Sequence, residues 1–358
     1  MKIGIIGTRG IPNQYGGFEQ FTEFVGPALV ERGHEVYVYN SSLHSYEEAS
    51  WKGVHLIKKS DPEDRVGTMG QFIYDLNCIL DTRKRNFDII FQLGYTSSSI
   101  WYFLMPKRSI VVTNMDGLEW KRSKYSRTVQ RFLKNAERLA ATKSDFLIAD
   151  SIGIQKYLYK KYSKKSEYIA YGATLFTAPD KKVLEKYDLQ PYSYNLLIAR
   201  MEPENNIETI LEGFVESASK EKLFLIGNYN NKFGNSLKKR FECENIIFWG
   251  PFYDIDALNN LRHFSHLYFH GHSVGGTNPS LLEAMASQAL IVAHDNIFNR
   301  TILEKDAYYF KTSAEIAEIL QERKNKIDYM QYIQNNNEKI TQLYSWTHIT
   351  NKVENFLK

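Results

Sequence analysis

The strongest constraint on the fold is an alternation along the chain between short β-rich runs and longer amphipathic stretches. The first half contains predicted strands at residues 2–6, 35–39, 54–57, 88–93, 109–113, 145–149 and 167–170. The second half restarts the pattern at residues 194–199, 223–226, 245–248, 266–270, 290–293 and 307–310. Strands separated by helical segments favour parallel sheets covered by helices on both faces. We therefore predict an α/β chain with two doubly wound domains.

The chain length and one weak stretch of the pattern place the domain boundary. With 358 residues the chain is more than twice as long as a domain of about 150 residues, so we expect two domains. The alternation is weakest at residues 171–192, where Pro179 and Pro191 interrupt it. We predict one Rossmann-like domain at residues 1–175 and a second at residues 190–342.

The end of the chain has the pattern of a helix with one apolar face. Trp346, Ile349 and Val353 follow one another at helical intervals. We therefore expect a terminal helix at residues 343–358 that packs back onto the first domain.

The composition excludes several classes of protein. Hydrophobic residues make up 43% of the chain and aromatic residues 14%, which excludes a disordered or low-complexity chain. The net charge of +4 is too small to indicate a nucleic-acid partner, and we expect none. Two cysteines are too few for a disulfide scaffold or a cysteine-based zinc site, and they favour a reducing, cytoplasmic compartment.

Signals for export or membrane insertion are weak. The apolar run before Gly7 has four residues, fewer than the about 7 to 15 of a signal peptide. The best apolar window, residues 100–106, is seven residues long, well short of the about 18 to 20 that a membrane span needs. We expect any membrane contact to be peripheral.

The loop after the first strand is a candidate ligand site, because ligands of open α/β sheets bind beyond the carboxyl ends of the strands. Its glycines imitate a dinucleotide fingerprint, at Gly4, Gly7 and Gly10. A fingerprint requires a helix to begin inside it, but Pro12 and a later glycine pair delay the helix to about Phe18. The second strand ends at Asn40 instead of the acidic residue that binds ribose. An NAD-dependent oxidoreductase is therefore an alternative with weak support.

The same loop has two other interpretations. Gly16 and Gly17 would let the backbone approach a diphosphate closely, and Arg9 would add a positive charge. The simpler alternative is that the two glycines only make a tight entry into the helix.

The most informative stretch lies at residues 270–285, which read HGHSVGGTNPSLLEAM. It has the pattern of a strand end, a glycine turn, an N-cap at Asn278 and a helix that starts with proline. The backbone amides of Gly276, Thr277 and Asn278 would bind an anion at the positive end of that helix. Glu283, one turn into the helix, would accept hydrogen bonds from sugar hydroxyls. The alternative is an ordinary capped helix with a surface glutamate.

His270 and His272 stand two residues apart, so a strand would place both on one face. That spacing allows a metal site, but no third ligand has a suitable spacing, and we expect no metal. A polar contact with substrate, or a half-buried histidine with ordinary partners, explains both better.

Two further loops carry charged residues. Arg200 follows the first strand of the second domain, where it would clamp a phosphate and stabilise a departing diphosphate; a solvated arginine is the alternative. Asp116 and Glu119 follow the strand at residues 109–113, and Asp116 would orient an attacking hydroxyl. An aspartate that only forms a turn before Gly117 competes equally.

With these loops in hand, the chain resembles glycosyltransferases of the GT-B fold, and within them the large retaining family 4. That fold has two doubly wound Rossmann-like domains facing a central cleft. The family carries a Glu-x7-Glu motif, a diphosphate-binding arginine and usually a lysine five residues after it. Arg200 matches the arginine, and Glu283 matches the second glutamate, which in the family holds the nucleotide ribose. The first glutamate is Gly275 here and the lysine is Asn205, so the contacts those family residues make do not carry over.

Both departures occur together in a narrower branch that resembles bacterial β-1,4-rhamnosyltransferases. The matching strings stand at residues 8–19, 116–122, 199–207 and 270–285. Such enzymes move rhamnose from dTDP-rhamnose to a saccharide carried on a polyprenyl diphosphate. The resemblance implies a retaining reaction in surface-polysaccharide synthesis, with no cofactor besides the nucleotide sugar and no metal. A transferase for another donor, such as a UDP-hexose, and a catalytically inert GT-B module are the alternatives.

The resemblance and the loop chemistry together give the expected site. Arg200 and Asp116 are the expected catalytic residues. The expected donor-binding residues are Gly16, Gly17, Arg200, His270, Gly276, Thr277, Asn278 and Glu283. The expected acceptor-binding residues are Arg9, Asp116 and Glu119.

A lipid-linked acceptor has independent support from the charge distribution. Residues 120–165, which we call the basic segment, hold 13 basic and three acidic residues, a charge of +10. Such a surface is attracted to anionic lipid, by about 1 kcal/mol for each basic residue near the membrane. We predict peripheral binding at the cytoplasmic face of a bacterial plasma membrane; a solvated basic face is the alternative.

Overall fold

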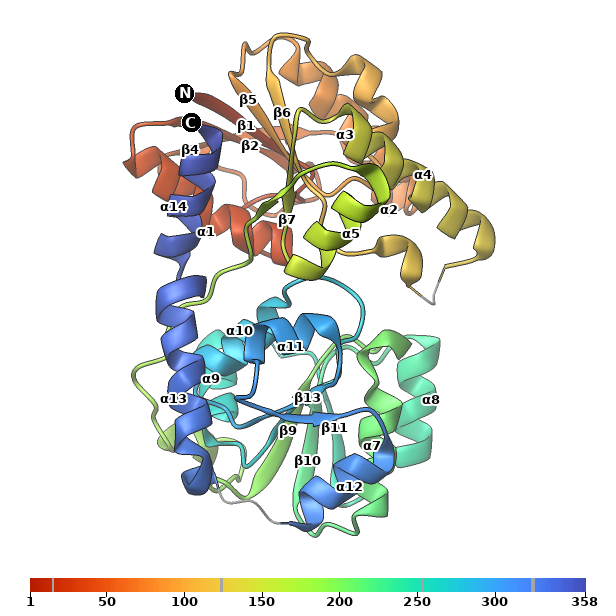
Figure 1. Cartoon of the computed structure of the whole chain (residues 1–358), viewed down its shortest axis with the longest axis vertical. Coiled ribbons are helices and arrows are strands. Elements are labelled where there is room, and N and C mark those ends of the chain that lie inside the picture. The colour runs from red at the N-terminus through yellow and green to blue at the C-terminus, as the bar shows by residue number, and fades with distance from the viewer. Residues whose placement is uncertain (15, 123–124, 253, 323–325) are drawn as a thin grey trace. The chain divides into compact units, whose positions relative to one another are not determined.

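The computed structural model describes all residues except 15, 123–124, 253 and 323–325 (Figure 1). The chain divides into two compact units. Unit 1 comprises Met1–Lys121, Tyr125–Tyr171 and Trp346–Lys358, and unit 2 contains Arg122 and Gly172–Ser345. Each unit is built on its own sheet.

Unit 1 contains an eight-stranded sheet in the order β3-β4-β2-β1-β5-β6-β7-β8. The strands are β1 (Lys2–Ile6), β2 (Glu35–Ser41), β3 (Ser50–Trp51), β4 (Val54–Lys59), β5 (Ile89–Leu93), β6 (Ile110–Asn114), β7 (Phe146–Ala149) and β8 (Glu167–Tyr168). All neighbours pair in parallel except β3, which runs antiparallel to β4. The loops after β1, β5 and β6 therefore leave the same edge of the sheet.

The helices of unit 1 connect these parallel strands. They are α1 (Gly17–Glu31), α2 (Glu63–Val66), α3 (Met69–Thr82), η1 (Ser99–Leu104), η2 (Glu119–Lys121), α4 (Arg127–Lys143), α5 (Ile152–Tyr162) and α14 (Trp346–Leu357). The last helix, α14, packs on α1, where the rings of Trp346 and Phe24 stack with centroids 4.4 Å apart. Helix α1 begins at Gly17, one residue before the predicted start.

Unit 2 contains a six-stranded, fully parallel sheet in the order β11-β10-β9-β12-β13-β14. Its strands are β9 (Tyr194–Ile198), β10 (Lys222–Ile226), β11 (Ile246–Gly250), β12 (Tyr268–His270), β13 (Ile291–His294) and β14 (Tyr308–Phe310). Its helices are α6 (Lys182–Glu185), η3 (Pro203–Asn205), α7 (Ile207–Glu216), α8 (Lys232–Phe241), α9 (Ile255–Phe264), α10 (Pro279–Ala286), α11 (Ile297–Leu303), α12 (Ser313–Gln321), η4 (Lys326–Tyr329), α13 (Met330–Lys339) and the π-helical turn η5 (Ile340–Tyr344).

The two sheets confirm the predicted α/β class with doubly wound domains. The predicted strands are all present, and most ends differ by one or two residues. Strand β3 was not predicted, because two residues are too few for a periodic pattern. Among the described helices, none combines the length and the apolar character that crossing a membrane requires.

Candidate functional site

In unit 2 the polar loops after β9 and β12 lie side by side, because these strands are neighbours in the sheet. Hydrogen bonds join the loops: Ser273 donates from its backbone N (3.0 Å) and its Oγ (2.7 Å) to the carbonyl of Glu204. Asn206 Nδ2 donates to the carbonyl of Gly271 at 2.7 Å. The loop that carries Arg200 is thereby fixed to the loop that leads into α10.

Asn205 has a structural role in this arrangement. Its side chain is 4% exposed, and its Nδ2 donates to the carbonyl of Arg200 at 2.7 Å. A Cβ atom at Gly271 would collide with the backbone carbonyl of Asn205, so only glycine permits this approach. At the position where the resemblance leads us to expect a lysine, the chain thus has an amide that holds the arginine loop.

His270 and His272 form a stacked pair at the carboxyl end of β12. Their ring centroids are 4.5 Å apart and their planes differ by 15°. His270 is 1% exposed, and neither of its ring nitrogens has a hydrogen-bond partner among the described residues. Burial holds the pKa of His270 well below its usual range. His270 is therefore a neutral, buried imidazole whose hydrogen-bonding capacity is unused.

Electrostatics places Arg200 near this pair. Burial, together with the positive charges of Arg200 and Arg122, lowers the pKa of His272 to about 3. Arg122 Nη1 also lies 3.4 Å from Glu204 Oε1. The strand ends therefore combine two neutral imidazoles with the guanidinium groups of Arg200 and Arg122, of which Arg122 is paired with Glu204.

Helix α10 starts as the sequence predicts. Pro279 is its first residue, and Asn278 is the N-cap, with Oδ1 accepting from the backbone N of Ser280 at 2.9 Å. Thr277 is 3% exposed, and Gly276 is partly exposed. Together with Asn278, they form the turn into the positive end of α10.

Gly275, where the resemblance leads us to expect a glutamate, has φ of +132°. This backbone conformation favours glycine. A Cβ atom there would meet nothing within 4 Å, so the position faces open space.

Glu283 on α10 has a partner that the sequence analysis missed. Arg262 on α9 donates from Nη2 to Glu283 Oε2 at 2.5 Å. The Arg262 side chain is 2% exposed, whereas that of Glu283 is 26% exposed. The buried guanidinium of Arg262 thus orients the Glu283 carboxylate, which remains partly exposed to solvent. Arg262 stands at the end of a helical pattern, where its sequence context is that of an ordinary surface residue.

In unit 1 the loop after β1 is organised by Glu19, another residue that the sequence analysis did not single out. Glu19 is 4% exposed and lies in the first turn of α1. Its Oε1 accepts from Arg9 backbone N at 2.7 Å and from Thr8 Oγ1 at 3.1 Å. Gly16 is the N-cap of α1 in an extended conformation that does not itself require glycine. A Cβ on Gly17 would lie 3.3 Å from the Tyr171 ring, so Gly17 does serve close packing.

Arg9 is held by acidic residues of its own unit. Its guanidinium pairs with Asp61 at 3.1 Å and also with Glu63. Asp61 is 2% exposed, so this pairing is largely sheltered from solvent. The positive charge of Arg9, which we assigned to ligand binding from the sequence, is therefore largely compensated within unit 1.

Asp116 and Glu119 lie close to Tyr171. Burial raises the pKa of Tyr171 well above its usual value, and the negative charges of Asp116, Asp150, Glu19 and Glu119 raise it further. Asp116 has φ of +45°, and its backbone N donates to Asn114 Oδ1 at 3.0 Å. Asp116 therefore does form the turn that the sequence offered as an alternative, and it lies in an acidic cluster at the strand edge.

The expected site residues thus form separate groups. In unit 2, Arg200, His270, Gly276, Thr277, Asn278 and Glu283 all belong to the loops after β9 and β12 or to α10. In unit 1, Gly17, Asp116 and Glu119 are grouped around Tyr171, whereas Arg9 points to Asp61. Tyr15 and Lys124, which belong to the sequence strings and the basic segment, lie outside the described residues.

The dinucleotide alternative loses support from the geometry after β2. The Asn40 side chain, at the position where a dinucleotide site needs an acid, bonds both the backbone N (3.2 Å) and the carbonyl (2.9 Å) of Ile11. It therefore serves to hold the loop after β1. Within the described ranges, no three His, Cys, Asp or Glu side chains gather as ligands of a metal would.

Comparisons with known proteins agree with this architecture. Residues 1–174 match a sequence family described as a domain of unknown function, DUF1972. No curated protein sequence matches the chain. The structure resembles sucrose-phosphate synthase from Thermosynechococcus elongatus, with a TM-score of 0.81 and 14% identity over 99% of this chain and 98% of that one.

Two further solved structures are similar over nearly their whole length. One is HepE from Anabaena in complex with UDP and glucose, with a TM-score of 0.75 and 15% identity over 99% of this chain and 98% of that one. The other is WaaG, a glycosyltransferase involved in lipopolysaccharide biosynthesis, with a TM-score of 0.71 and 14% identity over 100% of both chains. The fold is therefore that of the GT-B glycosyltransferases, with two Rossmann-like domains.

Proposed function

We propose that this protein is a retaining glycosyltransferase that uses a nucleotide sugar. The observation that carries the proposal is the grouping of Arg200, His270 and the start of α10 on one edge of the unit 2 sheet, where the His270 ring nitrogens have no partner in the described part of the chain. A GT-B fold that carries this combination of anion-binding and sugar-binding groups is suited to a sugar diphosphate.

Each group has a defined task in this proposal. Arg200 and the amides of Gly276, Thr277 and Asn278 bind the diphosphate, because guanidinium and helix-start amides both favour anions. His270 bonds hydroxyls of the donor, which satisfies buried nitrogens that otherwise reduce stability by about 1 to 3 kcal/mol. Glu283, oriented by Arg262, accepts from the ribose hydroxyls.

The transfer itself exchanges one bond for another on the same face of the sugar. The bond between the anomeric carbon and the diphosphate oxygen breaks, and a bond to the acceptor oxygen forms. The acceptor proton passes to the departing diphosphate, so no metal and no further cofactor takes part. Arg200 stabilises the charge that develops on the diphosphate, which is the largest contribution expected of the protein.

The donor is dTDP-rhamnose and the acceptor a saccharide on a polyprenyl diphosphate, in surface-polysaccharide synthesis. The support is the four matching strings, in which Gly275 and Asn205 depart together from the wider family. In unit 1 we assign Asp116 to orienting the acceptor hydroxyl and Glu119 and Arg9 to binding the acceptor. Gly16 and Gly17 serve the donor diphosphate. The second candidate donor is a UDP-hexose, which is favoured by the similarity to HepE, solved with UDP-glucose.

The lipid-linked acceptor brings the protein to a membrane from the cytoplasmic side. Helix α4 of the basic segment exposes Arg127, Arg131, Lys134 and Arg138. These charges attract anionic lipid, so we expect peripheral binding at the inner face of a bacterial plasma membrane. Flotation with anionic vesicles at low salt tests this part of the proposal, and failure to float would contradict it.

The experiment that tests the function has two steps. A thermal-shift screen of dTDP- and UDP-sugars identifies the donor, with dTDP-rhamnose expected to stabilise the protein most. Transfer to a lipid-diphosphate monosaccharide is then followed, and NMR of the product reports the anomeric configuration. Donor binding without transfer or hydrolysis would favour an inert module. Stabilisation by NAD but by no nucleotide sugar would favour the oxidoreductase.

A further inference from the structure

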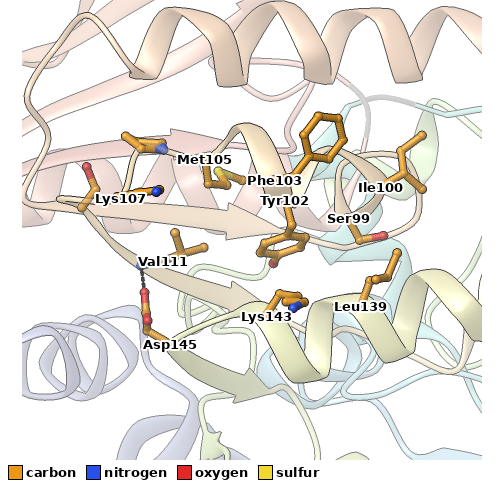
Figure 2. Close-up of a pocket in the computed structure, with 12 residues that line it drawn as sticks. Ser99, Ile100, Tyr102, Phe103, Met105, Lys107, Val111, Leu139, Lys143 and Asp145 are labelled. Carbon is orange, nitrogen blue, oxygen red and sulfur yellow. Dashed lines mark hydrogen bonds between the residues drawn. The ribbon is translucent and has the colours of Figure 1, made fainter.

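Unit 1 has a pocket that is lined by none of the proposed site residues. It lies between η1, β6 and the end of α4, and its volume is about 400 Å³, which is within the range of small-molecule sites (Figure 2). Figure 2 shows Tyr102 in its middle, with Leu139 and Lys143 of α4 on one side.

The pocket is lined by both apolar and polar residues, and most of the buried polar groups among them have partners; Ser99 Oγ has none among the described residues. Tyr102 hydroxyl lies 2.6 Å from Thr113 Oγ1 and 2.7 Å from Ser144 Oγ. Asp145 Oδ2 accepts from the backbone N of Val111 at 2.8 Å. Between Ile100, Met105, Val111 and Leu139 the lining is apolar, and this part of the pocket suits a hydrocarbon chain.

The mouth of the pocket is positively charged. Lys107 and Lys143 line it, both are exposed, and neither ammonium has an ion pair or hydrogen bond within the described part of the chain. Two more cations lie beside it: Arg83 donates to the carbonyl of Leu104 at 3.2 Å, and Arg108 donates to the carbonyl of Arg83 at 3.3 Å. Asp145 is the one acidic residue that lines the pocket.

A large apolar side chain stands exposed at the same place. Phe103 of η1 lines the pocket and is 74% exposed, although phenylalanine is normally buried. Next to η1, the rings of Phe72 on α3 and Phe132 on α4 lie 5.7 Å apart, and Phe132 is 36% exposed. Exposed aromatic rings among basic residues are typical of surfaces that insert into the interface of a membrane.

Two lipids with a phosphate and a hydrocarbon chain could occupy the pocket: the lipid-linked acceptor and a separate phospholipid of the membrane. The position of the pocket distinguishes between them. The pocket includes Ser109, just before β6, whereas Asp116 follows the other end of that strand. At about 3.3 Å per residue, the two ends are roughly 20 Å apart. In the lipid-diphosphate monosaccharide used as the test acceptor, the diphosphate is attached directly to the accepting sugar, so it cannot reach these lysines while that sugar is at Asp116. The occupant is therefore a separate lipid.

We propose that this pocket binds one anionic phospholipid of the membrane, with the hydrocarbon chain between η1, β6 and α4 and the phosphate at Lys107 and Lys143. The inference rests on the proposed function only for its membrane setting. Occupation of the pocket would fix unit 1 on the membrane through one defined contact, in addition to the diffuse attraction of the basic segment.

The test uses the full-length protein and a lipid that binds without a membrane. Dihexanoyl phosphatidylglycerol is titrated below its micelle concentration by calorimetry, and we expect saturable binding at one site. Dihexanoyl phosphatidylcholine, which carries no net charge, should bind at least tenfold more weakly. The charge-reversed K107E/K143E should lose at least tenfold in affinity for the anionic lipid.

Two controls separate the pocket from general charge. The K181E/K182E variant changes the charge by the same amount at two exposed lysines at the start of α6 in unit 2, and it should bind within twofold of the unmodified protein. L139W fills the pocket without changing its charge and should abolish binding, with circular dichroism checking that the variant folds. Equal losses in the two charge variants, unchanged binding by the folded L139W, or no saturable binding at all would overturn the proposal.

This experiment is independent of the transferase assay because it needs neither nucleotide sugar nor acceptor. Sugar transfer without lipid binding would contradict the pocket alone. Lipid binding without sugar transfer would contradict the proposed function alone.

Discussion

Arg262 Nη2 donates to Glu283 Oε2 at 2.5 Å, from a guanidinium that is only 2% exposed to a carboxylate that is 26% exposed. Asn259 Oδ1 accepts from Nη1 of the same guanidinium at 3.0 Å. A buried positive charge in the wall of unit 2 is thus compensated by the residue that is expected to meet the ribose. The pair links the stability of unit 2 to its proposed binding site.

This asymmetry in burial predicts unequal effects of removing either partner. Glu283→Ala leaves a buried, uncompensated guanidinium and should lower the free energy of unfolding by about 3 kcal/mol or more. Arg262→Met should have a smaller effect, because water can reach the remaining carboxylate. Urea unfolding of both variants without ligand tests this order, and a larger loss for Arg262→Met would contradict it.

Arg200 should affect turnover far more than stability. If its guanidinium stabilises the departing diphosphate, Arg200→Ala should lower kcat by about 100-fold, as is typical for loss of one transition-state donor. Arg200→Lys should recover part of the activity, since it keeps the charge but not the planar fork. The matched control is Arg240→Ala in the same unit, where the side chain is half-exposed and pairs with Glu208. Turnover of Arg200→Ala close to that of the unmodified enzyme would exclude the role.

His270, which is buried, and His272, which is partly buried, should make the protein less stable in acid. Burial lowers the pKa of His270 well below its usual range and that of His272 to about 3, so both stay neutral in the folded chain. In the unfolded chain they take up protons below about pH 6.5, which favours unfolding as the pH falls. Each contributes about 1.4 kcal/mol per pH unit in the window between pH 6.5 and its folded pKa.

Replacing both histidines should therefore flatten the pH dependence. Between pH 6 and pH 5, we expect H270Q/H272Q to lose about 2.4 kcal/mol less free energy of unfolding than the unmodified protein. Urea titrations at the two pH values measure this difference. An unchanged slope would show that the imidazoles are protonated in the folded state.

Glu137 should position the segment of unit 1 that carries Asp116 and Glu119 without contacting the substrate itself. This carboxylate is 1% exposed and accepts four hydrogen bonds. Their donors are Trp120 Nε1 (2.9 Å), Tyr157 hydroxyl (2.8 Å), Lys161 Nζ (2.8 Å) and Tyr162 hydroxyl (2.7 Å). Trp120 belongs to η2, which begins at Glu119. Glu137 therefore holds the segment that carries the proposed acceptor residues.

We expect Glu137→Gln to lower the free energy of unfolding by about 1 to 3 kcal/mol. The reason is that the NH2 group of glutamine is a donor, and it would face donors that now bond to the carboxylate. It should raise the KM for acceptor several-fold and leave the KM for donor unchanged. Tyr157→Phe, which removes one of the four donors, should reduce stability by only about 1 kcal/mol. A rise in the donor KM in place of the acceptor KM would contradict this positioning role.

The fold and part of the site follow from local sequence pattern. Alternating strands and amphipathic segments determine the two doubly wound units, since burying apolar faces leaves few other arrangements. The start of α10 is equally local: Asn278 caps the helix and Pro279 begins it, and both effects depend only on neighbouring backbone atoms. Gly271 and Gly275 stand in the loop that the pattern placed after β12.

What the sequence by itself determined is thus the architecture, the position of each loop and the chemical groups those loops carry. Only the tertiary structure decided which charges are compensated. It paired Arg9 with Asp61 and Glu63, joined Arg262 to Glu283, and left both ring nitrogens of His270 without partners among the described residues. The physical reason is that helix and strand patterns arise from residues a few positions apart. An ion pair, in contrast, depends on which distant elements meet and on how much water their packing excludes.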